Sequence, residues 1–94
     1  MISMLKVEYT TQFKRDLKLA NKRKKNMGAL QKIMKKIENE ETLSPSLRDH
    51  PLTGNWKTYR ELHVEPDWLL IYKLIPDAKV VIFVRTGTHS DLFK

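Results

Sequence analysis

The chain has 94 residues, enough for one domain over residues 1–94 but not for a second hydrophobic core. It contains no cysteine, which excludes a disulfide scaffold, a thiolate zinc site and a cysteine nucleophile. The 18 Lys and Arg residues outnumber the 11 Asp and Glu residues, and the net charge of +7 favours a polyanionic partner such as RNA, DNA, an anionic lipid surface or an acidic protein.

Several absences further restrict the class of protein. No apolar run approaches the ~20 residues that cross a bilayer, so we expect no membrane segment. The first residues lack the long apolar stretch and the small-residue cleavage site of a signal peptide. Together with the lack of cysteine, this predicts a cytoplasmic protein.

The first half of the chain predicts one strand and two helices. Apolar and polar residues alternate over residues 4–9, which is typical of a half-buried strand. Helical periodicity follows, with Thr10 or Thr11 as the capping residue. Met27-Gly28 interrupts this periodicity and predicts the end of the first helix. A second periodic segment over residues 30–37 completes a helical hairpin.

The second half predicts three strands after a loop over residues 42–55. An extended segment over 56–64 precedes two apolar, β-rich runs over 68–75 and 80–84. Gly87 ends the last strand, and a short terminal turn follows. The order β-αα-βββ predicts an α+β fold in which the helical hairpin packs on one face of an antiparallel sheet. The other face is expected to stay partly open and to offer room for a site.

A dense basic segment extends from Lys14 to Lys25, where Asp16 is the sole acidic residue. On a helix, this segment forms either a polyanion-binding surface or an ordinary solvated face, and we favour the first because the charge is so one-sided. The residues that we expect to contact RNA here are Lys14, Lys18, Lys22, Arg23 and Lys25.

The three histidines all lie in or beside turns of the second half: His50, His63 and His89. With Asp67 they could hold Zn²⁺, but Pro66 excludes a helical i, i+4 ligand pair, so we expect no metal and no cofactor. Histidine also moves protons near neutral pH, as metal-independent RNA cleavage requires.

Phosphate charge must also be stabilised in such a reaction. Arg60 and Arg85 are the candidate residues, since a guanidinium binds phosphate oxygens through forked hydrogen bonds. Composition alone leaves three unrelated surface histidines as the alternative.

Five segments appear in a recognisable order and spacing. They are Asp49-His50-Pro51-Leu52, Gly54-Asn55-Trp56-Lys57-Thr58-Tyr59-Arg60, His63-Val64-Glu65-Pro66-Asp67-Trp68, Leu70-Ile71-Tyr72-Lys73 and Arg85-Thr86-Gly87-Thr88-His89-Ser90-Asp91-Leu92-Phe93. This series closely resembles the YafQ branch of the RelE/ParE toxin superfamily, and the likeness in element order extends over nearly the whole chain.

The resemblance implies a bacterial type II toxin that cleaves mRNA in the ribosome. It implies an acidic antitoxin of the RelB or DinJ kind, with operator DNA bound only through the antitoxin complex. The motif positions are His50, His63, Asp67, Trp68, His89 and Phe93.

Roles for these residues follow from the resemblance. The histidines would form the acid/base group, with base and acid unassigned. Asp67 would orient or charge-stabilise an imidazole, and Arg85 would stabilise phosphate charge. Phe93 is expected in the site, while Trp68 is either a base-stacking platform or a core residue.

Two rival functions remain. A ParE-like gyrase poison would share the fold, but such proteins lack this set of histidines. A DNA-binding regulator is compatible with the basic helix, but the chain shows no convincing helix-turn-helix, and the β-rich half would be unexplained.

Overall fold

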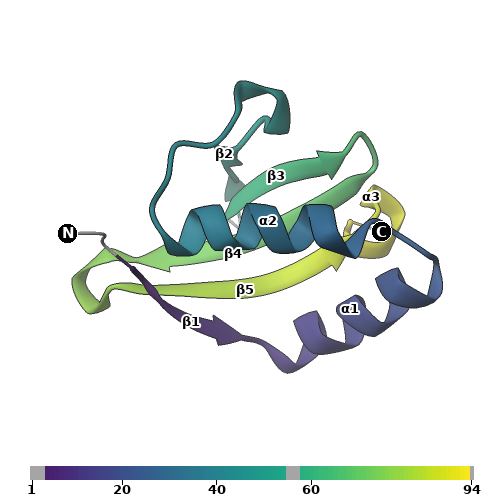
Figure 1. The fold of residues 1–94 in the computed structure, drawn as a ribbon, viewed down its shortest axis with the longest axis horizontal. Coiled ribbons are helices and arrows are strands. Elements are labelled where there is room, and N and C mark those ends of the chain that lie inside the picture. The colour runs from purple at the N-terminus through teal and green to yellow at the C-terminus, as the bar shows by residue number, and fades with distance from the viewer. Residues whose placement is uncertain (1–3, 55–57, 94) are drawn as a thin grey trace.

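Five strands form one mixed sheet in the computed structural model, which describes residues 4–54 and 58–93 (Figure 1). The elements in chain order are β1 (Lys6–Tyr9), α1 (Thr11–Lys22), α2 (Met27–Glu38), β2 (His50–Pro51), β3 (Arg60–Glu65), β4 (Trp68–Ile75), β5 (Val80–Gly87) and α3 (His89–Leu92). The α+β class is confirmed, and the β-αα-βββ order holds apart from the added two-residue strand β2 and the one-turn helix α3. Trp56, with the neighbouring residues 55 and 57 of the sequence motif, lies outside the described residues.

The strand order in the sheet is β1-β5-β4-β3-β2. Strands β3, β4 and β5 form the expected antiparallel meander. Strand β1, however, pairs in parallel with β5, so the sheet is mixed and not purely antiparallel. The alternation over residues 4–9 predicted a strand, but it could not predict which strand lies next to it or in which direction. The two-residue strand β2 is too short to produce a sequence pattern, and its pairing with β3 places His50 opposite Glu61.

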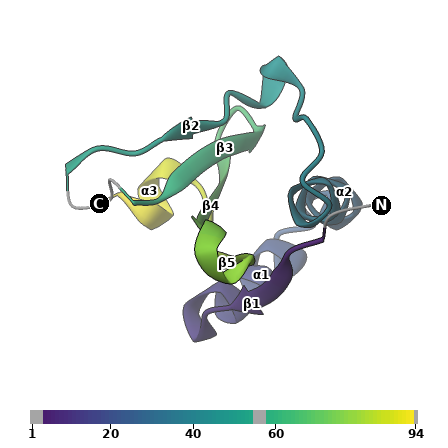
Figure 2. The same ribbon diagram turned by 90° about the vertical axis from the view of Figure 1, so that its left-hand side faces the viewer.

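The two long helices supply one side of a single hydrophobic core. Phe13 of α1 and Leu30 of α2 are almost fully buried and belong to the same cluster as Leu62, Leu70 and Phe83 of the sheet. Figure 1 shows α2 crossing in front of the sheet and α1 lying beside β1 and β5; Figure 2 shows β5 and α2 nearly end-on. None of the described helices has the length and apolar character that a membrane span requires.

Helix boundaries follow the capping residues. Thr10 begins α1, because its hydroxyl oxygen accepts a hydrogen bond from the Phe13 N–H at 2.9 Å. The prediction that Met27-Gly28 ends the first helix was wrong, since both residues lie in the first turn of α2. The Asn26 side chain caps α2 by accepting from the Ala29 N–H at 3.0 Å, and a glycine in a first turn is compatible with such a start.

The side chains of strand β3 alternate between the two faces of the sheet. Leu62 is fully buried in the helix-side core, so its neighbours Glu61 and His63 point to the opposite face. Strand β4 is buried on both faces, which explains its continuous apolar run. The face opposite the helices therefore carries polar side chains of β3, and its edge carries His50 of β2.

Candidate active site

His63 and His89 meet at the end of the sheet where β3 and β5 finish. Their ring centroids are 5.9 Å apart, with an angle of 47° between the ring planes. His63 belongs to β3, whereas His89 is the first residue of α3. Residues far apart in the sequence thus form a pair of imidazoles at one edge of the molecule.

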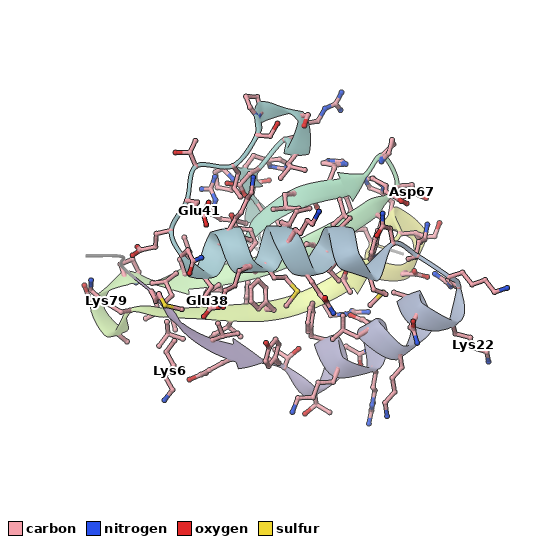
Figure 3. The ribbon with its side chains drawn as sticks, in the orientation of Figure 1. Lys6, Lys22, Glu38, Glu41, Asp67 and Lys79 are labelled. Carbon is pink, nitrogen blue, oxygen red and sulfur yellow. The ribbon has the colours of Figure 1, made fainter. Side chains whose placement is uncertain are left out.

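Asp67 binds His89 through two hydrogen bonds. One of its oxygens, Oδ1, accepts from the His89 backbone N–H at 2.9 Å and lies 2.6 Å from Nδ1 of the imidazole. These hydrogen bonds hold the pKa of the Asp67 carboxyl below its usual value, with the backbone N–H contributing most. The ionised carboxylate therefore fixes the ring orientation through Nδ1, and Nε2 is the ring nitrogen that Asp67 does not bind. Figure 3 labels Asp67 at the end of the molecule beside α3.

Glu61 is a buried carboxylate between the other two histidines. Its Oε1 lies 3.4 Å from Nε2 of His50 and 3.8 Å from Nε2 of His63. Only 7% of its surface is exposed. The other ring nitrogen of His63, Nδ1, lies 3.3 Å from the Pro66 carbonyl oxygen, so both nitrogens of this ring face oxygen acceptors.

Glu61 was missed in the sequence. Glu61 and His63 are two residues apart on a strand and therefore share a face. The metal hypothesis from the sequence considered only helical spacing and Asp67. With His50, the two residues bring one ligand atom each to within 4.8 Å of one another. Two imidazoles and a carboxylate are a donor set that suits Zn²⁺. The spacing argument from Asp67 overlooked this cluster, and the expectation that no metal is bound stays a prediction.

His50 is held in place through its neighbour Asp49. The Asp49 carboxylate accepts from Arg60 Nη2 at 3.0 Å and from the Tyr72 hydroxyl at 2.6 Å. Burial, followed by the hydrogen bond to Asp49, raises the pKa of Tyr72 well above its usual value, so its hydroxyl stays a donor. Arg60 thus has an internal carboxylate partner and lines a cavity of about 420 Å³ to which none of the three histidines contributes.

Arg85 also has an internal carboxylate partner. Its Nε and Nη2 donate to the two oxygens of Asp16 at 2.8 and 3.3 Å, and the Thr86 N–H donates to the same carboxylate at 3.0 Å. Asp16 lies on α1 and is buried. The ion pair therefore ties α1 to β5, and a contact of Arg85 with phosphate stays a prediction.

The two aromatic candidates differ in exposure. Trp68 is 1% exposed and lies in the core, whereas Phe93 is 40% exposed just after α3. A base can stack only on an accessible ring face, so we do not retain the predicted RNA contact of Trp68 in this conformation. The buried indole N–H of Trp68 has no hydrogen-bond partner among the described residues.

The basic segment divides into two groups. Lys14, Lys18 and Lys22 are exposed on α1. Arg23 forms an ion pair with Asp91 of α3 at 2.7 Å. Lys25 lies 3.5 Å from Glu65 and 5.9 Å from the centroid of the Trp68 ring. The end of this segment therefore contacts the part of the molecule that carries the histidines.

The family model of the bacterial YafQ toxins of type II toxin–antitoxin systems matches residues 5–94. The chain belongs to this family. It is 50% identical over 88 residues to the mRNA interferase toxin YafQ of Escherichia coli K12, an alignment that covers 93% of this chain and 94% of that protein. Membership confirms the resemblance found in the sequence.

Solved structures agree with the fold. The toxin of the E. coli DinJ–YafQ toxin–antitoxin complex superimposes with a TM-score of 0.89 at 48% identity, covering 97% of this chain and 99% of that one. A metal-bound toxin from Helicobacter pylori gives a TM-score of 0.90 at 38% identity, covering 96% and 100%.

Proposed function

We propose that this YafQ-family toxin is an mRNA endoribonuclease that acts on the ribosome and is neutralised by an acidic antitoxin. One observation supports the proposal most strongly: His63 and His89 lie side by side, each next to a carboxylate, Glu61 or Asp67. The mRNA interferase activity of the E. coli relative gives independent support. A gyrase poison would not need such a set of proton carriers.

The reaction is a transfer of phosphate within the RNA chain. A base removes the proton of a 2′-hydroxyl, and the 2′-oxygen forms a bond to the adjacent phosphorus. The bond from phosphorus to the 5′-oxygen breaks, and an acid gives that oxygen a proton. The products are a 2′,3′-cyclic phosphate and a 5′-hydroxyl end, and the protons balance without a metal ion.

The imidazoles of His63 and His89 are the proposed base and acid, in an order that the pH dependence of single variants would assign. Asp67 holds the His89 ring and compensates its positive charge when it takes up a proton. His50 and Glu61 form the neighbouring pair. Phe93, exposed just after the helix that begins at His89, can contact a base of the substrate.

The exposed cations of α1 are the proposed contact with ribosomal RNA. Lys14, Lys18 and Lys22 have no ion-pair partner among the described residues and project from the helix. A domain of this size offers few contacts for positioning a flexible mRNA by itself, so the ribosome would supply the orientation. The same surface favours an acidic antitoxin, and operator DNA would be bound only through the antitoxin complex.

The test is cleavage of a defined mRNA by purified protein with and without ribosomes. We expect cleavage only on ribosomes, with 5′-hydroxyl ends. Replacement of His50, His63 or His89 by Ala should lower the rate ~10²–10⁴-fold without unfolding the protein. Efficient cleavage of free mRNA would contradict the ribosome dependence, and 5′-phosphate ends would contradict the 2′-hydroxyl mechanism.

A further inference from the structure

The C-terminal helix α3 carries His89 but is only one turn long, over His89–Leu92. A single turn is unstable alone, so side-chain bonds to the rest of the protein must determine its position. Asp67 supplies such a bond on one side, to the first residue of the helix. The other side is bound by a residue of a different element.

The second bond is an ion pair between Arg23 and Asp91. Arg23 Nη1 lies 2.7 Å from Asp91 Oδ2, and Nη2 lies 3.4 Å from Oδ1. The guanidinium thus faces both carboxylate oxygens in the bidentate arrangement, which fixes direction as well as distance. Arg23 and the Thr88 N–H together lower the pKa of Asp91 to about 2, so the pair stays charged across the neutral range.

Asp91 is also part of the start of α3. Its Oδ2 accepts from the Thr88 N–H at 3.0 Å, while its own N–H donates to the Thr88 hydroxyl at 3.1 Å. These reciprocal bonds form a capping box around His89. The position of the Asp91 carboxylate therefore determines the position of the turn that carries the His89 imidazole.

Arg23 extends from a fixed part of the backbone. The Lys24 N–H donates to the Asn21 carbonyl and the Lys25 N–H to the Ala20 carbonyl, both at 3.0 Å. This is the Schellman arrangement at a helix end. Helix α1 is in turn bound to β5 through the ion pair between buried Asp16 and partly buried Arg85, so Arg23 is joined to the core of the protein.

The end of β5 is shaped for close packing of α3. A Cβ on Gly87 would lie 3.0 Å from both Cβ and Oδ2 of Asp91 and 3.4 Å from Cδ2 of Leu92. A side chain at this position would push the Asp91 side chain away by a few tenths of an ångström. The close packing against Gly87 and the ion pair with Arg23 thus both involve the Asp91 side chain.

We propose that Arg23 and Asp91 are positioning residues for catalysis: their ion pair holds α3 so that His89 stays between Asp67 and His63. The inference rests on the proposed function, in which His89 transfers a proton. It assigns Arg23 to the orientation of the site and not to RNA binding. A displacement of ~1 Å in a reacting group can cost ~10²-fold in rate, so this ion pair affects the chemical step.

The experiment compares variants in single-turnover cleavage on programmed ribosomes. The variants are Arg23→Gln, Asp91→Asn, the double variant and Arg23→Lys. Asparagine retains an oxygen that can accept from the Thr88 N–H. Lys32→Gln is the matched control, because Lys32 is exposed on α2 and its replacement removes the same charge.

We expect both single variants to lower the maximal rate about 10- to 100-fold and to leave the half-saturating ribosome concentration unchanged. The double variant should be no slower than either single variant, because both remove the same interaction. Arg23→Lys should be intermediate, since an ammonium restores the charge without the fork. Lys32→Gln should cleave like the wild type.

A readout independent of activity is the ring-proton NMR signal of His89 in the free protein. Arg23→Gln and Asp91→Asn should each shift or broaden this signal, and Lys32→Gln should not. Wild-type rates together with an unchanged His89 signal would overturn the inference. So would weaker ribosome binding by Arg23→Gln at an unchanged maximal rate, which would make Arg23 an RNA contact.

A separate result would show that the proposed function is wrong. If His89→Gln cleaved at the wild-type rate, His89 would not be a proton carrier. The NMR comparison would then still decide whether the ion pair positions α3.

Discussion

Asp67 holds His89 by two groups at once, the backbone N–H at 2.9 Å and Nδ1 of the imidazole at 2.6 Å. The carboxylate thus fixes both the start of α3 and the direction of the ring. These bonds lower the pKa of the Asp67 carboxyl, so it stays ionised below the pH at which an aspartate ordinarily gains a proton. An imidazole held in this way presents Nε2 for proton transfer in one orientation.

Asp67→Asn should lower the single-turnover rate about 10- to 100-fold, because the amide can hold the ring but cannot compensate its charge. Asp77→Asn is the matched control, since Asp77 is exposed in the turn between β4 and β5. Because the lowered pKa keeps Asp67 ionised, the loss should be the same from weakly acidic to weakly alkaline pH. An equal rate for Asp67→Asn and wild type would remove Asp67 from the mechanism.

Glu61→Gln should also reduce cleavage, by ~10²-fold, because the carboxylate near His50 and His63 loses its charge. The exposed Glu8→Gln is the control. Zinc should inhibit the wild type by occupying the ligand atoms of this cluster, and Glu61→Gln should bind zinc more weakly. Zinc inhibition that is unchanged in the variant would place the zinc elsewhere.

Much of the fold could be predicted from the sequence, because local patterns determine it. The alternation around Leu62 and the apolar run of β4 specified strands and faces. The parallel pairing of β1 with β5 could not be predicted, since a four-residue strand has no pattern that specifies its neighbour. The end of α1 was misplaced because the true end uses Lys24 in a left-handed conformation and not a glycine.

The sequence predicted which residues form the site better than it predicted the contacts among them. The three histidines and Asp67 follow from the resemblance, but Glu61 required the alternation of β3 to be applied to polar residues. Arg60 and Arg85 were predicted from the sequence as phosphate ligands, yet each forms an ion pair with an aspartate of the same chain. Such pairings join residues 11 and 69 positions apart, which no local pattern can reveal.

Tyr72→Phe tests how β2 is held. The variant removes the 2.6 Å hydrogen bond from the buried hydroxyl to Asp49, next to His50. We expect a loss of ~1–2 kcal/mol in the free energy of unfolding and a severalfold lower cleavage rate. Tyr9→Phe, at a half-exposed tyrosine, should change stability by less than ~0.5 kcal/mol. Urea unfolding measures both, and equal stability of the two variants would contradict the expectation.

Lys24→Gly should stabilise the protein. Lys24 has φ = 59°, a left-handed conformation that is costly for any residue with a side chain. Glycine removes this cost but loses more entropy on folding, so the net gain is about 0.5–1 kcal/mol. Lys32→Gly, inside α2, should instead destabilise by ~1 kcal/mol. A lower urea midpoint for Lys24→Gly would show that the lysine side chain contributes more than the strain costs.

The exposed cations of α1 should determine how fast the antitoxin associates. Reversal of Lys14, Lys18 and Lys22 to Glu avoids Arg23 and Lys25, whose internal ion pairs would otherwise be broken as well. Association should slow, with a smaller difference at high salt, because screening removes long-range attraction.

The control for this triple variant is the reversal of Lys32 and Lys36, which are exposed on α2. Ribosome co-sedimentation should weaken in the α1 variant, since ribosomal RNA carries the same sign of charge as an acidic antitoxin. Stopped-flow association against ionic strength measures the first effect. If the α1 variant matched the α2 control in both assays, the basic face of α1 would be a solvated surface without a part in recognition.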